Sequence, residues 1–136
     1  MNAGRNTMGE PVPAPPPVIL VVEDDVLVRN IVAAYLRECG YDVIEANSAD
    51  EAIRVLQADV KVDVVFSDVN MPGSMDGFGL AQWVRRERPW LRVILTSGAA
   101  RTAKEAGDLC EQGPVLAKPY DHAELERHIR ALLAAR

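Results

Sequence analysis

Acidic, hydroxyl and ammonium side chains follow several short apolar runs of this 136-residue chain. Asp68 comes directly after the run 62–67, Val-Asp-Val-Val-Phe-Ser, which is typical of a strand buried on both faces. Taken alone, an aspartate at this point could equally begin a turn. Its chemical role therefore depends on which other side chains the fold brings to the same place.

Three more apolar runs, at 18–22, 92–96 and 114–117, are predicted to be strands that end in polar groups. These groups, in chain order, are Glu23 with Asp24, Thr96, and Lys118. A weaker strand at 42–46 ends in small residues, as a peripheral strand would. Each polar residue has an ordinary role by itself, since acids cap helices, threonine favours strands and lysine is solvated. Their joint occurrence at four strand ends indicates a common site.

Apolar residues at helical spacing lie between these strands. The predicted helices run from about 27 to 39, 48 to 58, 77 to 88, 99 to 112 and 121 to 136. In the first of them we expect one buried stripe, formed by Leu27, Val28, Ile31, Val32, Tyr35 and Leu36. Five strands alternating with five helices predict an α/β fold with a parallel sheet covered on both faces. In such a sheet the strand carboxyl ends meet at one edge, where ligands bind.

The predicted cluster favours phosphoryl chemistry on an aspartate. Three crowded carboxylates repel one another unless a cation joins them, and an all-oxygen set suits Mg²⁺. Asp68 is then the candidate nucleophile, forming an aspartyl phosphate, while Thr96 and Lys118 donate to the phosphoryl oxygens. The sequence contains no Gly-rich P-loop, so we do not expect the domain to bind ATP itself.

Composition limits the remaining possibilities. The net charge of −5 argues against non-specific nucleic-acid binding, and no apolar run approaches the length of a membrane span. Cys39 and Cys110 have no metal-ligand spacing, and we interpret both as buried thiols of a cytoplasmic protein. Residues 1–17 are rich in proline and are expected to be a disordered arm, with one PxxP match at Pro13 and Pro16. Residues 18–136 are then a single domain.

Four motifs of the chain resemble those of one family. They are Val-Ile-Leu-Val-Val-Glu-Asp-Asp at 18–25, Asp-Val-Asn-Met-Pro with a later Met-Asp-Gly at 68–77, Ile-Leu-Thr-Ser-Gly at 94–98, and Ala-Lys-Pro-Tyr at 117–120. Together they cover the four strand ends that carry polar groups. From residue 18 to 136 the chain resembles a receiver domain of bacterial two-component signalling, the response-regulator family.

The resemblance implies a doubly wound, flavodoxin-like sheet of strand order 2-1-3-4-5. It implies that Asp68 takes a phosphoryl group from a phosphohistidine of a sensor histidine kinase or a histidine phosphotransfer protein. Glu23 and Asp24 would hold Mg²⁺ together with Asp68 and the backbone carbonyl of Asn70. Thr96 and Lys118 would be the switch hydroxyl and the lysine of the family, and the Lys118–Pro119 peptide would be cis.

Two positions depart from the family pattern. The loop after Asp68 is one residue longer than usual, at Ser74, and the position of the aromatic switch residue is occupied by Val115. Because a valine has no ring to move, we expect phosphorylation to be reported by another element. The weakly patterned segment 99–112 is our candidate.

Three outcomes of phosphorylation stay open. With nothing expected after the last helix, the domain would contact a downstream protein, relay its phosphoryl group, or act as a phosphate sink. The resemblance implies that contact would use the face formed by the last two helices and the strand between them, where self-pairing into a homodimer is also open. A small Mg²⁺-dependent hydrolase with an aspartyl-phosphate intermediate is the alternative function. It is disfavoured because Asn70, not an acid, lies two residues after Asp68. A degenerate receiver is disfavoured because the acids and the lysine are all present.

Overall fold

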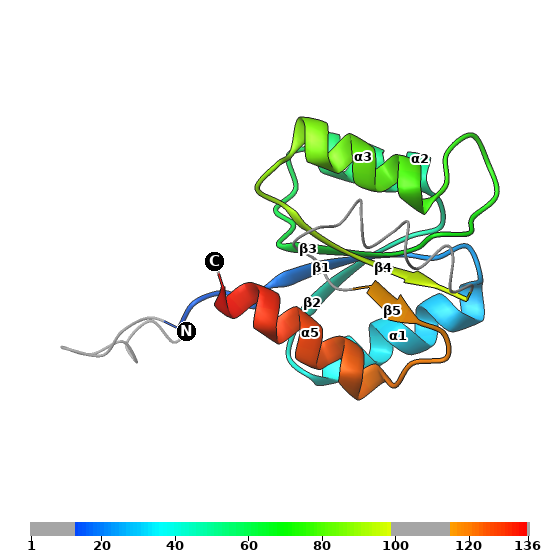
Figure 1. Ribbon diagram of the computed structural model, residues 1–136. Coiled ribbons are helices and arrows are strands. Elements are labelled where there is room, and N and C mark those ends of the chain that lie inside the picture. Colours follow the sequence, from blue (N-terminus) through cyan, green and yellow to red (C-terminus); the bar gives the residue numbers. More distant parts are fainter. Residues whose placement is uncertain (1–12, 99–114, 136) are drawn as a thin grey trace.

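The computed structural model describes residues 13–98 and 115–135, and these form a parallel five-stranded sheet between two layers of helices (Figure 1). The strands are β1 (Val18–Val22), β2 (Asp42–Ala46), β3 (Val64–Asp68), β4 (Arg92–Ser97) and β5 (Val115–Ala117). They lie in the order β2-β1-β3-β4-β5, and every neighbouring pair is parallel. The predicted α/β class and strand order are therefore confirmed.

Four helices are present among the described residues: α1 (Val26–Glu38), α2 (Ala49–Gln57), α3 (Gly77–Glu87) and α5 (His122–Ala134). The remaining predicted helix, at 99–112, lies outside the described residues. So do residues 1–12 of the predicted arm.

Each face of the sheet has its own apolar core. α2 and α3 cover one face, where Leu56, Leu80 and Val84 pack on β-strand residues such as Val65 and Leu95. α1 and α5 cover the other face (Figure 1). There the core includes Leu36, Ile129, Phe66 and Ile94. β1 and β3 are almost completely buried because they lie in the middle of the sheet with a helical layer on both sides.

Local sequence signals explain where the helices begin. Ser48 caps α2 by accepting a hydrogen bond from the Glu51 N–H. Asp25 caps α1 by accepting from the Val28 N–H at 3.1 Å, a role that the sequence interpretation did not give it. Asp76 caps α3 by accepting from the Gly79 N–H.

Two expectations about exposure are wrong. Cys39 is exposed at the end of α1, not buried. In α1 itself only the second half of the predicted stripe is covered. Val32 and Leu36 are buried, whereas Val26, Leu27, Val28 and Ile31 are between 41% and 69% exposed. Among the described residues, the strands and helices leave these apolar side chains largely uncovered, although Arg29 of the first turn contacts Glu45 of β2 at 3.2 Å. Figure 1 shows α1 on the same side of the sheet as α5.

No described helix has the length and apolarity needed to span a membrane.

Candidate functional site

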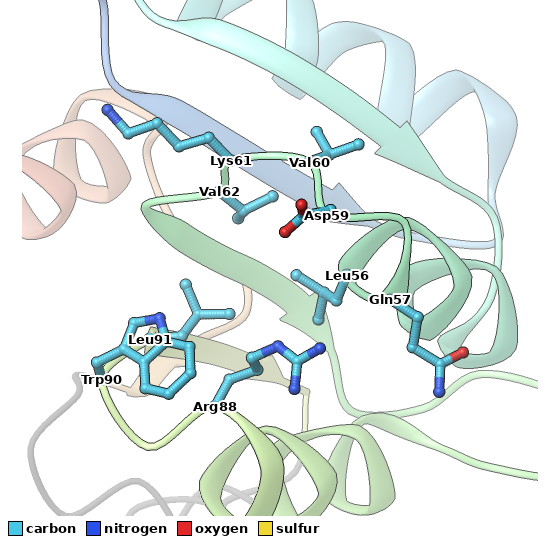
Figure 2. Close-up of a pocket in the computed structure, with 9 residues that line it drawn as sticks. All are labelled: Leu56, Gln57, Asp59, Val60, Lys61, Val62, Arg88, Trp90 and Leu91. Atoms are coloured by element: carbon cyan, nitrogen blue, oxygen red, sulfur yellow. The ribbon is translucent and has the colours of Figure 1, made fainter.

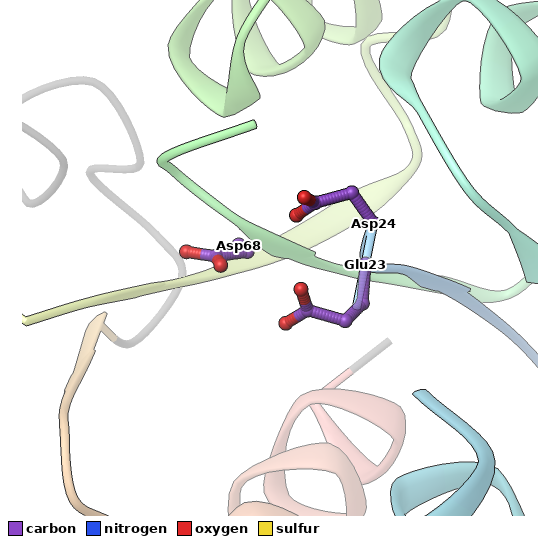
Figure 3. Close-up of side chains that lie close together, drawn as sticks. All are labelled: Glu23, Asp24 and Asp68. Atoms are coloured by element: carbon purple, nitrogen blue, oxygen red, sulfur yellow. The ribbon is translucent and has the colours of Figure 1, made fainter. Parts of the chain in front are cut away.

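Three carboxylates meet at the carboxyl edge of β1 and β3 (Figure 3). Glu23 and Asp24 follow β1 directly, and Asp68 is the last residue of β3. Their nearest oxygens all lie within 4.8 Å of one another. Glu23 and Asp68 are buried and Asp24 is exposed, so the cluster opens to solvent on one side. The sequence predicted this gathering because the carboxyl ends of parallel strands share one edge. In the structure β1 and β3 are parallel neighbours.

Asp68 is held by contacts on both carboxylate oxygens. The Lys118 ammonium, which follows β5, lies 3.0 Å from Oδ2. The Asn70 backbone N–H donates to Oδ1 at 3.2 Å. Lys118 thus reaches across β4 to a carboxylate on β3, which fixes the orientation of that carboxylate.

Thr96 lies at the same edge but directs its hydroxyl elsewhere. It pairs with Asp68 in the β3–β4 register and is buried. Its Oγ1 donates to the Leu116 carbonyl on β5 at 3.0 Å. The structure therefore brings Thr96 beside Asp68 while its hydroxyl is engaged with the neighbouring strand.

The electrostatics of the cluster favour a bound cation. Burial is the main cause that raises the pKa of Glu23 to about 7; a hydrogen bond from the Asp25 N–H opposes the rise, and the negative charge of Asp68 contributes to it. That N–H donates to Glu23 Oε2 at 3.1 Å. A cation placed among the three carboxylates would offset their repulsion and favour the ionised form of Glu23.

The donor set fits Mg²⁺. Three carboxylates offer hard oxygen ligands at one open site, which leaves room for water or phosphoryl oxygens. The N–H of Asn70 donates to Asp68, so the backbone of Asn70 lies beside the carboxylate cluster.

The Lys118–Pro119 peptide is cis, as the resemblance implied.

Tyr120 is a neighbour of the cluster that the sequence interpretation quoted in the Ala-Lys-Pro-Tyr motif but gave no role. Its ring packs edge-on against Phe66 of β3, with ring centres 5.8 Å apart. Burial, and then the charges of Glu23 and Asp68, raise the pKa of Tyr120 to about 12, so its phenol stays neutral beside the site. The only signal in the sequence was its place two residues after Lys118.

The loop between β3 and α3 closes tightly on Asp68. A Cβ atom on Gly77 would lie 2.3 Å from the Asp68 carbonyl oxygen, so a side chain at this position would collide with backbone. The lengthened part of the loop is accommodated at Gly73, which has a φ of +113°. Next to it, the Ser74 hydroxyl donates to Asp50 in the first turn of α2 at 2.9 Å.

Comparison with known proteins agrees with this fold and cluster. The family model described as the response regulator receiver domain matches residues 19–130. The chain belongs to the response regulator receiver domain family, whose members act in two-component signalling.

Individual relatives cover the same part of the chain. It is similar to "Probable transcriptional regulator ycf27" of Cyanophora paradoxa, with 33% identity over 85% of this chain and 47% of that protein. The chain spans about half the length of the curated relatives it matches. Among solved structures it is similar to the signal receiver domain of an HD domain-containing protein from Pseudomonas fluorescens Pf-5. That match has 28% identity, a TM-score of 0.79, and coverage of 88% of this chain and 96% of the other. It also shares its fold with the response regulator TrrA from Thermotoga maritima, solved in complex with Mg²⁺-BeF, at 24% identity, a TM-score of 0.77, and coverage of 85% and 98%.

Proposed function

We propose that this receiver domain accepts a phosphoryl group on Asp68, from a phosphohistidine, at a site assembled with Mg²⁺. One observation carries the proposal: Asp68 belongs to the three-carboxylate cluster and also contacts the Lys118 ammonium at 3.0 Å. The donor's P–N bond breaks, and a bond forms between phosphorus and an Asp68 oxygen. The proton needed by the leaving imidazole comes from solvent or from the donor.

The proposed roles of the side chains follow from their positions. Glu23, Asp24 and Asp68, with the Asn70 carbonyl, would hold the metal, and the bound metal would neutralise charge on the transferring oxygens. Lys118 is the fixed cation that faces the phosphoryl oxygens. Thr96 becomes a donor to the phosphoryl group after its hydroxyl leaves the Leu116 carbonyl, which couples β4 and β5 to the state of Asp68.

The exposed apolar start of α1 supports a protein as the phosphoryl donor. Val26, Leu27 and Ile31 are exposed, and the helix that carries them begins only three residues after Glu23 of the carboxylate cluster. An apolar patch beside a reactive site is the expected footprint of a transient partner. We therefore propose that a histidine kinase or histidine phosphotransfer protein docks here. We place this reaction in the cytoplasm, where ATP is available to the kinase.

The output of the domain is proposed to be contact with a downstream protein or onward relay of the phosphoryl group. Phosphoryl transfer to Asp68 and the later hydrolysis of the aspartyl phosphate both take place on Asp68 of this chain. Neither reaction turns over a free substrate. Residues 18–136 form the domain and residues 1–17 a separate arm.

A phosphoryl analogue tests the site directly. Beryllofluoride and Mg²⁺ added together to the ¹⁵N-labelled chain should shift backbone amides of residues that follow β1, β3, β4 and β5. Either reagent alone should give smaller changes, since the analogue needs both the carboxylate and the cation. Asp68→Asn should abolish the joint effect, while Asp42→Asn, an exposed acid at the opposite end of a strand, should retain it. A joint effect that persists in Asp68→Asn would overturn the proposal.

A further inference from the structure

A groove lies at the end of the sheet opposite Asp68, between the loop before β3 and the loop before β4 (Figure 2). It has a volume of about 410 Å³. Its lining residues lie within the segments 56–62 and 88–91. The proposed phosphorylation chemistry uses none of them.

Trp90 gives the groove an aromatic wall. Its side chain is 72% exposed, the largest exposed fraction of any large apolar residue among those that the structure describes. Val60, on the facing loop, is 44% exposed, and the buried Leu56 and Leu91 form the apolar floor. An indole on an open groove with apolar neighbours is a favourable surface for binding another chain.

The rim of the groove carries more positive than negative charge. Lys61 and Arg88 contribute cations, and Asp59 contributes one carboxylate. Arg88 is fixed in place, since its guanidinium donates to the Glu87 carbonyl at 2.9 Å and lies 5.4 Å from the centre of the Trp83 ring.

The Pro-rich arm leaves the domain beside this groove. The Val18 N–H donates to Asp63 Oδ2 and the Val18 carbonyl accepts from the Asp63 N–H, both at 2.8 Å. Asp63 in turn pairs with Lys61 of the rim at 3.9 Å. In Figure 2 the Lys61 side chain extends toward the start of β1, where the arm enters the sheet. Residues 13–16 are exposed, so this part of the arm lies outside the groove in the structure.

We propose that the segment Pro11–Pro13 of the arm docks in the Trp90 groove of its own chain, in a second arrangement of the arm in which Pro13 leaves the exposed position that the structure shows. Neighbouring strands lie about 4.8 Å apart, so the loop before β4 is roughly 10 Å from the start of β1. A polyproline II segment rises about 3.1 Å per residue, which puts Pro13 roughly 12 Å and Pro11 roughly 19 Å along the arm from Pro17. The arm therefore has the length to cross β3 and lie against Trp90.

The chemistry of the arm matches that of the groove. Proline-rich segments are held in an extended form before binding, and grooves lined by aromatic side chains recognise them. Glu10 is the only acid among residues 1–17, and it immediately precedes Pro11, where it would approach the cations of the rim. Because the arm is tethered to the domain by a short linker, its effective concentration at the groove is about millimolar. A weak contact is therefore sufficient for the arm to occupy the groove.

Indole N–H signals of the two tryptophans test the proposal in the ¹⁵N-labelled full chain. Trp90→Phe assigns the signals, and a soluble paramagnetic agent reports how accessible each indole is. In Pro11→Ser/Pro13→Ser, relaxation of the Trp90 signal should rise about twofold or more, as expected from a groove at least half occupied in the wild type. The matched control Asn6→Ser/Thr7→Ser should behave as the wild type, and the Trp83 signal should be the same in all three chains, which shows that each is folded.

Two results would overturn the proposal. Equal relaxation of Trp90 in the wild type and the proline variant would mean that the arm does not cover it. Protection of Trp90 that disappears on dilution would mean that the arm of a second copy occupies the groove. Neither result bears on Asp68, so failure here is separate from failure of the proposed function.

Discussion

Asp68 has a polar partner on each carboxylate oxygen before any ligand binds. Lys118 contacts Oδ2, and the Asn70 N–H contacts Oδ1. Each oxygen of an ionised carboxylate can accept two contacts, so a position on each stays available for a cation or an incoming phosphorus atom. The side chain is thus oriented in advance, which lowers the entropic cost of reaction at this residue.

Glu23 makes Mg²⁺ binding dependent on pH. Because burial raises its pKa to about 7, Mg²⁺ must displace a proton from Glu23 below that pH. We expect the Mg²⁺ affinity, measured by calorimetric titration, to fall by about tenfold for each pH unit below about 7 and to level off above it. Glu23→Gln should bind Mg²⁺ more weakly and lose this dependence. An affinity for the wild type that is the same on both sides of that pH would contradict the account.

The same raised pKa affects the stability of the metal-free chain, with a definite sign. Between the usual carboxyl value of 4.5 and about 7, Glu23 holds its proton in the folded state and loses it in the unfolded state. The contribution of Glu23 to the free energy of unfolding therefore decreases as the pH rises through this window.

The sequence indicated which residues would gather, but it could not give their contacts. Glu23, Asp68, Thr96 and Lys118 were predictable because strand ends of a parallel sheet share one edge. That Thr96 donates to the Leu116 carbonyl depends on a side-chain rotation and on a strand twenty residues away. The capping role of Asp25 had a recognisable signal, since it is an acid directly before a helix. The sequence interpretation assigned its neighbours Glu23 and Asp24 to a metal and gave Asp25 no role.

Among the elements, the β3–α3 loop is constrained by contacts at both of its ends. Gly77 lies against the Asp68 backbone, and Ser74 ties the lengthened part of the loop to Asp50 of α2. The sequence showed the extra residue at Ser74 but not its partner, because that contact joins residues 24 positions apart.

Gly77→Ala is expected to destabilise the domain. Its Cβ would lie 2.3 Å from a carbonyl oxygen that cannot move without displacing Asp68, and overpacking of this kind costs about 1–3 kcal/mol. Urea denaturation measures the change. Gly98→Ala is the matched control, since nothing lies within 4 Å of a Cβ there and its φ is not in the left-handed region. Equal stability of the two variants would contradict the close approach at Gly77.

α1 illustrates how periodicity can mislead. Its apolar residues recur at helical spacing, which predicted one buried stripe, yet the described strands and helices leave the apolar side chains of its first turns exposed. A periodic pattern shows that a helix has an apolar face, but not how far the rest of the domain extends along it.

Leu27→Ser tests the use of this exposed face. Phosphoryl transfer to the chain from its protein donor should slow by roughly tenfold, since truncating a central interface residue costs on the order of 1–2 kcal/mol. Transfer from acetyl phosphate should not change, because a small donor needs no docking surface. Val60→Ser, which removes an exposed apolar side chain at the opposite end of the sheet, should leave both rates as they are. A parallel loss with both donors would show that Leu27 supports the fold rather than docking.

In the whole molecule, the alternation of strands and helices was sufficient to predict the architecture. The five strands and their order agree with the structure, as do the four helices within the described residues. Continuous apolar runs identify central strands, and the weak run at 42–46 identifies the edge strand β2, because burial on both faces constrains composition strongly. The hypothesis that segment 99–112 reports phosphorylation lies outside the described residues and stays a prediction. It can be tested by amide exchange across that segment with and without beryllofluoride.

The central claim is that Asp68 is the residue that becomes phosphorylated, with Mg²⁺ required. The most direct measurement is the intact mass of the chain after incubation with acetyl phosphate and Mg²⁺, followed by the same measurement on Asp68→Asn. We predict a gain of one phosphoryl group in the wild type that is lost when Mg²⁺ is chelated and is absent from Asp68→Asn. A wild-type chain that gains no mass, or an Asp68→Asn chain that gains as much as the wild type, would contradict the account.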